Sequence, residues 1–312
     1  MKVQHHYVID TKLLVYNLKH SGSDILNVFN SIGKVLGNFP KGKVILCADL
    51  GESRYRKELY PQYKGHRKAL RKDAEEHEAF NKKYKKIIEL FKKLPVTTLA
   101  VPFVEADDLA SLYCEKYKNK PDHKIHLITG DMDWYHMVLG TINIDFTNPK
   151  TLETVTKVEI EKTYNVTSRH EFTILKALQG DRSDNLKFIK QFGEVRIRQI
   201  WDKVLMLLDQ SSDNVCEIIE EFIEGKKIMQ LHQYHTECGN DTVKKAYECN
   251  MAIGDPFTNT DKLSAQELVA FNNCLKHVPE PITLSDFNTY MLDNFHTLIQ
   301  PSHIATKIFQ LQ

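Results

Sequence analysis

Short apolar runs alternate with longer amphipathic stretches along the first half of the chain. The apolar runs have the length of buried strands, and they fall at residues 6–9, 43–48, 97–101, 123–129 and 141–146. Between them, apolar positions recur with the helical period at residues 24–37, 71–94, 105–117 and 133–139. Strands that alternate with helices are typical of a mostly parallel sheet flanked by helices. The pattern therefore predicts an α/β domain.

The strand pattern fades beyond about residue 157. Helical periods continue there, at residues 158–164, 169–179, 194–208, 212–224, 242–251, 264–275 and 283–295. We therefore predict an α/β core over residues 1–155 and a mainly helical region over residues 156–312.

The formal net charge is only +1, which excludes a uniformly basic nucleic-acid-binding protein. The charge is segregated, however, because residues 51–100 contain 14 lysines and arginines against 7 acids. No apolar run reaches the ~18 residues of a membrane span, and the six cysteines form no CxxC pair. We expect a cytoplasmic protein without membrane contact, with reduced cysteines and without structural zinc.

Three predicted strands end on aspartates. Asp10 and Asp49 close the first two strands, and Asp131 follows the fourth strand after one glycine. A single aspartate after a strand is more often a helix cap or a turn residue. The carboxyl ends of parallel strands, however, meet at one edge of the sheet. We therefore expect these three carboxylates to share a crevice.

Further acids come in tight groups, at residues 105–108, 131–133 and 181–184. So many like charges in one pocket are unfavourable unless cations neutralise them. Oxygen-only ligands favour magnesium or manganese over zinc. Two such ions about 4 Å apart can hydrolyse a phosphodiester bond without a protein nucleophile. The acids beyond the three strand ends are Glu105, Asp107, Asp108, Asp133, Asp181 and Asp184.

Basic and aromatic residues interleave between the second strand and the charged stretch at residues 71–94. The basic residues could bind phosphates, while Tyr55, Tyr60 and Tyr63 could stack on nucleobases. A loop packed by its tyrosines, followed by a solvated surface helix, is the alternative interpretation. Lys64 is the candidate for polarising the scissile phosphate. The bases are Arg54, Arg56, Lys57, Lys64, Arg67 and Lys68.

The segment after Asp184 has the pattern of a helix, a turn at Gly193 and a second helix. Backbone N–H groups at such a helix start can hold a phosphate. Four cations could strengthen this grip, namely Lys187, Lys190, Arg196 and Arg198. The alternative interpretation is a plain helical hairpin with one solvated face.

The order of these blocks resembles the 5′ nuclease superfamily, which includes flap endonucleases, the 5′ nuclease domain of bacterial DNA polymerase I and phage 5′→3′ exonucleases. The resemblance spans about residues 7–198 and is clearest to the compact phage and bacterial members. Its blocks are Asp10, Asp49 with the basic tract that contains Tyr60-Pro61-x-Tyr63-Lys64-x-x-Arg67, Glu105-Ala106-Asp107-Asp108, Thr129-Gly130-Asp131-x-Asp133 and Gly180-Asp181-x-Ser183-Asp184-Asn185.

The resemblance implies a 5′→3′ exonuclease or flap endonuclease in replication or repair, in a bacterial or phage-infected cell. Its substrate would be DNA with a 5′ single strand or flap, or RNA–DNA, cut by a monomer with two Mg²⁺ ions that Mn²⁺ can replace. Residues 51–95 would form a helical arch with Lys64 and Arg67 as positively charged catalytic residues at its foot, and Tyr63 would stack on a nucleobase. The implied metal ligands, direct or through water, are Asp10, Asp49, Glu105, Asp107, Asp108, Asp131, Asp133, Asp181 and Asp184.

One departure concerns the hairpin after Asp184, which holds the duplex backbone in the family and often binds a monovalent cation such as K⁺ in its turn. The family pattern has two glycines, whereas only Gly193 is present in Gln191-Phe192-Gly193. This weakens the case for K⁺ but leaves the carboxylate cluster untouched.

Two other functions compete with this hypothesis. A PIN-type endoribonuclease would share the fold and the acidic pocket, but it uses fewer carboxylates and lacks the Asp181/Asp184 pair and the hairpin. A non-catalytic protein that binds DNA structures would have lost acids, whereas every expected block here keeps its acid. No sequence signal identifies a partner from the replication machinery.

Overall fold

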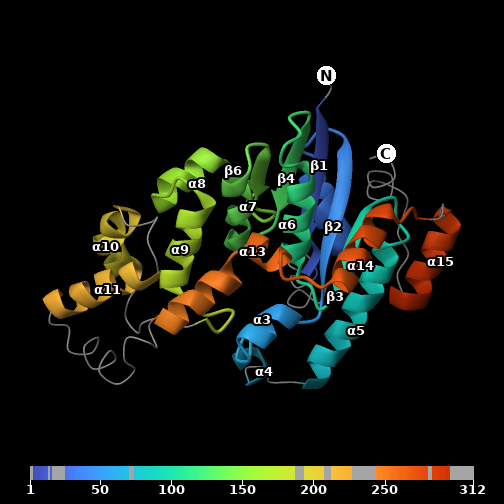
Figure 1. The fold of residues 1–312 in the computed structure, drawn as a ribbon. Helices are drawn as coiled ribbons and strands as arrows, with labels where there is room; N and C mark the ends of the chain where they lie inside the picture. The colour runs from blue at the N-terminus through green and yellow to red at the C-terminus, as the bar shows by residue number, and fades with distance from the viewer. Residues whose placement is uncertain are drawn as a thin grey trace.

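A six-stranded sheet in the order β3-β2-β1-β4-β5-β6 lies at the centre of the molecule (Figure 1). The computed structural model describes residues 3–12, 15, 25–69, 74–186, 193–206, 212–226, 244–279 and 283–295. β1 to β5 pair in parallel, and β6 is antiparallel to β5. The strands are β1 (Gln4–Asp10), β2 (Gly42–Leu50), β3 (Thr97–Pro102), β4 (His123–Ile128), β5 (Ile144–Thr147) and β6 (Thr154–Val155).

Side chains along the central strands alternate between two hydrophobic clusters, because successive residues of a strand point to opposite faces. Tyr7 and Ile9 of β1 belong to the cluster on one face, and Val8 belongs to the other. The first face is covered by α2 (Ile25–Leu36), α5 (Ala74–Phe91) and α15 (Leu284–Phe295). The second face is covered by α6 (Ala106–Tyr117) and α7 (Tyr135–Gly140). The predicted α/β fold is therefore present.

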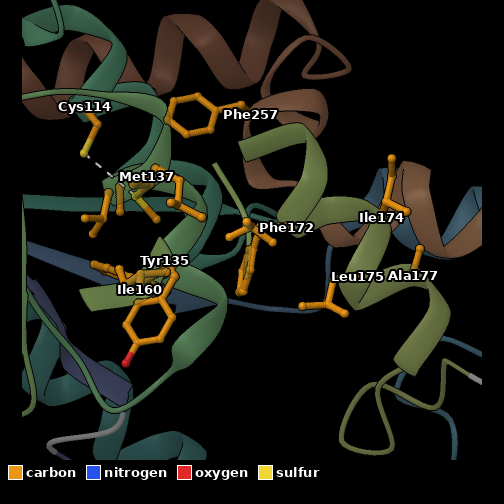
Figure 2. Packing of buried hydrophobic residues seen from close by; sticks show 14 of the residues in the cluster. Cys114, Tyr135, Met137, Ile160, Phe172, Ile174, Leu175, Ala177 and Phe257 are labelled. Carbon is orange, nitrogen blue, oxygen red and sulfur yellow. Dashed lines mark hydrogen bonds between the residues drawn. The ribbon is translucent and has the colours of Figure 1, made fainter. Parts of the chain in front are cut away.

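Helices of the second half pack into the cluster on this second face. Figure 2 shows Phe172 of α9 on the side of α7, where its ring centroid lies 6.3 Å from that of Tyr135, and both residues belong to one buried cluster. The predicted boundary near residue 155 thus marks a change of secondary structure within a continuous core. The helices are α8 (Lys157–Tyr164), α9 (Arg169–Gln179), α10 (Glu194–Met206), α11 (Ser212–Lys226), 244–254, α13 (Pro256–Thr260) and α14 (Ala265–Lys276).

The basic tract after β2 folds into two short helices that the sequence pattern did not indicate. They are α3 (Arg54–Leu59) and α4 (His66–Ala69), and α3 lies beside the carboxyl ends of the strands (Figure 1). The Ser53 side chain caps α3 by accepting a hydrogen bond from the Arg56 N–H. These helices carry the predicted phosphate-binding residues to the edge of the sheet where the aspartates lie.

Two predicted boundaries shift for local reasons. The stretch 133–139 divides into a 3₁₀ turn (Met132–Trp134) and α7. β5 begins at Ile144 rather than at residue 141, because the Thr141 hydroxyl donates to the Met137 carbonyl at 3.0 Å and stays with the end of α7. Within the described part of the chain, no helix is long and apolar enough to cross a membrane.

Candidate active site

Three aspartates meet at the carboxyl edge of the sheet, as their positions after parallel strands predicted. Asp10 is the last residue of β1, and the Thr129 hydroxyl, just after β4, donates to its Oδ2 at 3.2 Å. The same hydroxyl accepts a hydrogen bond from the Asp131 N–H at 3.1 Å. The ends of the neighbouring strands β1 and β4 are therefore joined through one threonine.

Asp49 connects the end of β2 to the start of α6. Its Oδ1 accepts a hydrogen bond from the Ala106 N–H at 2.6 Å, at the positive end of the helix dipole. Its Oδ2 contacts the Lys12 Nζ at 2.8 Å. Glu105 is the N-cap residue of α6, so this helix start brings the acidic block at residues 105–108 beside the strand ends.

The acids at residues 181–184 reach the same edge from the end of α9. The helix stops at Gly180, whose φ of 66° is a conformation that favours glycine. The Asp181 Oδ1 then accepts hydrogen bonds from the N–H groups of Ser183 and Asp184, at 2.6 and 3.3 Å. This tight turn presents both carboxylates on one side.

The foot of the basic tract is tied to this turn. The Lys64 N–H donates to the Asp184 carbonyl at 2.9 Å, and the Arg67 Nη2 lies 2.8 Å from the Asp184 Oδ1. The Lys64 Nζ bridges to Glu105 Oε2 at 2.7 Å. Lys64 has a left-handed backbone with a φ of 55°, which costs a residue with a side chain about 1 kcal/mol. Its neighbours hold it in this conformation.

A pocket opens where these segments converge. Its walls include four of the predicted ligands together with two cations, and the chain reaches it from α3, α6, the turn after β4, α9 and the turn after α9. Those six residues are Arg56, Asp107, Asp133, Lys176, Asp181 and Asp184. Acids that lie far apart in the sequence therefore face one cavity.

The pKa values of these carboxyls reflect burial and crowding. Burial raises the pKa of Asp131 to about 7, and a neighbouring carboxylate adds to the shift. Burial also raises the pKa of Asp108 to about 6, although Arg56 opposes the shift. Burial opposes ionisation of Glu105 too, but Lys64 and Arg56 lower the pKa of that carboxyl to about 2. Parts of the cluster are thus short of compensating positive charge.

Within the described part of the chain, six of the nine predicted ligands contact a lysine or arginine, and the cations are Lys12, Arg56, Lys64, Arg67 and Lys176. Among the described residues, no three His, Cys, Asp or Glu side chains form a ready-made ligand set. Lysine and arginine groups hold the carboxylates instead. The donors nevertheless fit a hard divalent cation, because all of them are oxygen atoms.

Comparison with known proteins places this site in a family. The profile of the family described as 5′-3′ exonuclease, N-terminal resolvase-like domain, matches residues 4–165, which is more than half of the chain. The chain belongs to this family. The predicted membership of the 5′ nuclease superfamily is thereby confirmed, and so is the prediction of a nuclease of this kind at the level of the family.

Individual relatives of this family member align over part of their length. A 5′-3′ exonuclease from Buchnera aphidicola subsp. Schizaphis graminum is 26% identical over 181 residues, which are 57% of this chain and 58% of that protein. The alignment therefore spans less than two thirds of the Buchnera protein. The flap endonuclease of Escherichia phage T5 is 27% identical over 215 residues, which are 65% of this chain and 72% of that protein.

A solved structure shares the fold over almost the whole chain. It is the crystal structure of the phage T5 flap endonuclease in a pseudo-enzyme-product complex with DNA and metal ions. The TM-score is 0.68 at 21% identity, and the match covers 89% of this chain and 100% of that chain. At this identity the likeness shows the fold, which includes the helical second half.

Three predicted site residues of this family member differ from expectation. Arg56 is 2% exposed and is bound by carboxylates, so it cannot meet a substrate phosphate as it lies. The Tyr63 ring is 1% exposed and cannot stack on a base, because its hydroxyl turns inward to Glu105 and Asp184, at 2.9 and 2.8 Å. Asp108 is 1% exposed, does not line the pocket, and has both oxygens in contact with Arg56, so it faces α3 and not the pocket.

Within the described residues, none of the other predicted nucleic-acid contacts lines this pocket. The guanidinium of Arg54 pairs with Glu58 and Glu267 on the surface. Lys57 donates to the Tyr63 carbonyl and pairs with Glu52. Gly193, Arg196 and Arg198 lie at the start of α10. Residues outside the description are Lys187, Lys190 and the side chain of Lys68.

Two site residues have no counterpart among the sequence predictions. Lys176 lies in the last turn of α9, and its Nζ is 2.8 Å from the Asp133 Oδ1. Lys12, two residues after the end of β1, contacts Asp49. Their nearness in sequence to Asp181 and Asp10 is the only available signal, and it does not distinguish them from the many other lysines.

Proposed function

We propose that this chain is a metal-dependent 5′ nuclease that hydrolyses phosphodiester bonds of DNA at 5′ ends, flaps or primer junctions. One observation carries the proposal: carboxylates from separate segments of the chain face one pocket at the carboxyl edge of a parallel sheet. A relative with the same fold binds DNA and metal ions, as its crystal structure states. Family membership supports the same chemistry.

Two Mg²⁺ ions, which Mn²⁺ can replace, would suit this cluster, because its ligand atoms are all carboxylate oxygens. When bound, such ions lower the pKa of a coordinated water and neutralise charge on the scissile phosphate. Asp108 would support the site through its contact with Arg56 and would not hold an ion itself, because it is 1% exposed and does not line the pocket. The residues that would hold the ions, directly or through water, are Asp10, Asp49, Glu105, Asp107, Asp131, Asp133, Asp181 and Asp184.

Lys64 and Arg67 supply positive charge at the edge of the pocket. The Lys64 side chain is 12% exposed, and its burial opposes the charged form, but Glu105 and Asp184 raise the pKa of its ammonium group, so it stays charged at neutral pH. A substrate phosphate at this edge would meet a fixed cation already oriented by two carboxylates. Such preorganised charge stabilises the transition state without reorganisation.

The 5′ single strand would approach along α5, which continues the basic tract. Tyr84, Ile87 and Ile88 bury one side of this helix against the sheet. Lys82 on the helix is 73% exposed. The packed side anchors the helix, and the exposed lysines offer charge to a phosphate backbone.

The test incubates the purified chain with 5′-labelled flap, nicked and single-stranded DNA in Mg²⁺ or in EDTA. We expect short 5′ products only with metal, a loss of at least about a hundredfold in Asp131→Asn and a strong decrease in Lys64→Ala. Asp122→Asn is the matched control, because Asp122 lies just before the opposite end of β4. Uncut DNA under every metal condition would refute the proposal, and cutting of single-stranded RNA alone would favour the PIN-type alternative.

A further inference from the structure

Arg56 contacts every carboxylate of the acidic block at residues 105–108. Its Nη1 and Nη2 lie 2.7 and 2.9 Å from the two oxygens of Asp108. Its Nη2 is 2.9 Å from Asp107 Oδ2, and its Nη1 is 3.3 Å from Glu105 Oε2. The Nε completes the set on the Ile253 carbonyl at 3.5 Å. One guanidinium thus uses its whole donor fork on acceptors within the protein.

The short helix α3 sends its two arginines to opposite environments. Arg56 points inward and is 2% exposed, whereas the Arg54 side chain is 40% exposed and pairs with Glu58 and Glu267. The Ser53 N–H, at the start of the helix, donates to Glu105 Oε1 at 3.2 Å. The helix therefore packs on the acidic block, and this packing places the Arg56 side chain in its buried position.

The acidic block has no equivalent second cation in the described structure. Lys64 reaches Glu105 at 2.7 Å, but no ion pair joins it to Asp107 or Asp108. Asp108 is 1% exposed, so water cannot solvate its carboxylate in place of a second cation. An uncompensated buried carboxylate is strongly unfavourable, and here Glu105 and Asp108 are both buried beside the partly exposed Asp107. Arg56 meets this need before any metal arrives.

We infer that Arg56 is an internal counter-cation that holds Glu105, Asp107 and Asp108 in place without metal, so that the site folds before the ions bind. Arg56 is a positioning residue, because it acts through the carboxylates and lies too deep to touch substrate. The part of the inference that concerns metal rests on the proposed function. Without Arg56, the block would need divalent ions to fold, and stability would become metal-dependent.

The test compares melting temperatures of Arg56→Met and Arg54→Met in EDTA and in Mn²⁺. Arg54→Met is the matched control, because it removes the same group from the same helix at an exposed position. In EDTA we expect Arg56→Met to melt about 5–10 °C below the control. In saturating Mn²⁺ at least half of that deficit should disappear, so the metal-induced rise is larger than in wild type. A deficit that Mn²⁺ leaves unchanged would indicate only lost packing and would overturn the inference.

Two further variants keep the test informative if Arg56→Met does not fold. Arg56→Lys keeps the charge but not the fork, so its melting temperature in EDTA should lie between wild type and Arg56→Met. The double variant Arg56→Met/Asp108→Asn removes a repelling charge and should recover stability in EDTA. If the double variant melts no higher than Arg56→Met, the counter-cation role is contradicted. If Arg56→Met does not fold, a double variant that is also unfolded contradicts that role.

Calorimetric titration of the wild type with Mn²⁺ separates the two proposals. If Mn²⁺ does not bind, the proposed function fails, while the comparison in EDTA still decides the role of Arg56. If Mn²⁺ binds and Arg56→Met has the same melting temperature as Arg54→Met in EDTA, the inference fails and the proposed function stands.

Discussion

Acid should destabilise the protein through His6, a buried histidine at the end of the sheet opposite the candidate site. His6 is 3% exposed, and its ring nitrogens lie 2.7 Å from the Tyr113 hydroxyl and 2.7 Å from the His123 Nδ1. Burial lowers the pKa of His6 to about 4, and nearby His123 and Lys43 add to the shift. The unfolded chain titrates this group at about 6.5.

The sign follows from proton binding in the two states. Between pH 6.5 and pH 4 the unfolded chain binds a proton at His6 that the folded protein refuses, so the free energy of unfolding falls as the pH falls. From about pH 7.5 to about pH 5 the loss is about 2 kcal/mol, as an upper bound for one histidine. Buried carboxyls with raised pKa values, such as Asp131, act in the opposite direction over this range.

The assay therefore compares variants rather than relying on one pH profile. Urea unfolding at about pH 7.5 and about pH 5 gives the pH-dependent change for wild type and for His6→Gln. We expect the change to be smaller by up to about 2 kcal/mol in His6→Gln. His170→Gln, at an exposed position on α9, is the control and should keep the wild-type change. Equal changes in wild type and His6→Gln would refute the reasoning.

Two further predictions concern close contacts. A Cβ at Gly42 would lie 2.4 Å from the His5 carbonyl oxygen, so Gly42→Ala should lower the free energy of unfolding by about 2 kcal/mol. A Cβ at Gly33 in α2 would meet nothing within 4 Å, so Gly33→Ala should instead raise the free energy of unfolding by about 0.5–1 kcal/mol. Urea unfolding measures both variants, and equal effects of the two substitutions would contradict the steric argument. Tyr63→Phe removes the hydroxyl shared by Glu105 and Asp184 and should lower the free energy of unfolding by about 1–2 kcal/mol in the same assay, whereas no loss would contradict the two hydrogen bonds.

The arrangement of strands was predictable because it depends on local patterns. Apolar runs of strand length identified β1 to β4, and parallel pairing then requires that Asp10 and Asp49 lie at one edge. The turn of Asp181 and Asp184 was predictable as a pair, because Gly180 ends the helix just before them. The edge that they share with the strands followed from the family resemblance.

The orientation of the basic tract was not predictable. Arg54, Arg56 and Lys57 occur within four residues, and a helix of six residues is too short for a periodic signal to show which side is buried. Tyr63 has the same ambiguity, since an aromatic ring beside basic residues is consistent either with stacking on a nucleobase or with packing in a core. The structure buries both Arg56 and Tyr63 because the acidic block offers them acceptors.

The sequence by itself determined the fold class, the family and the list of carboxylates, because these depend on periodicity, on residue type and on order along the chain. Tertiary structure alone decided which cations neutralise those carboxylates. Lys12, Arg56 and Lys176 reach their acids only after segments far apart in sequence have packed together. Charge compensation is a matter of distances of a few ångströms between side chains, and no pattern along the chain encodes such distances.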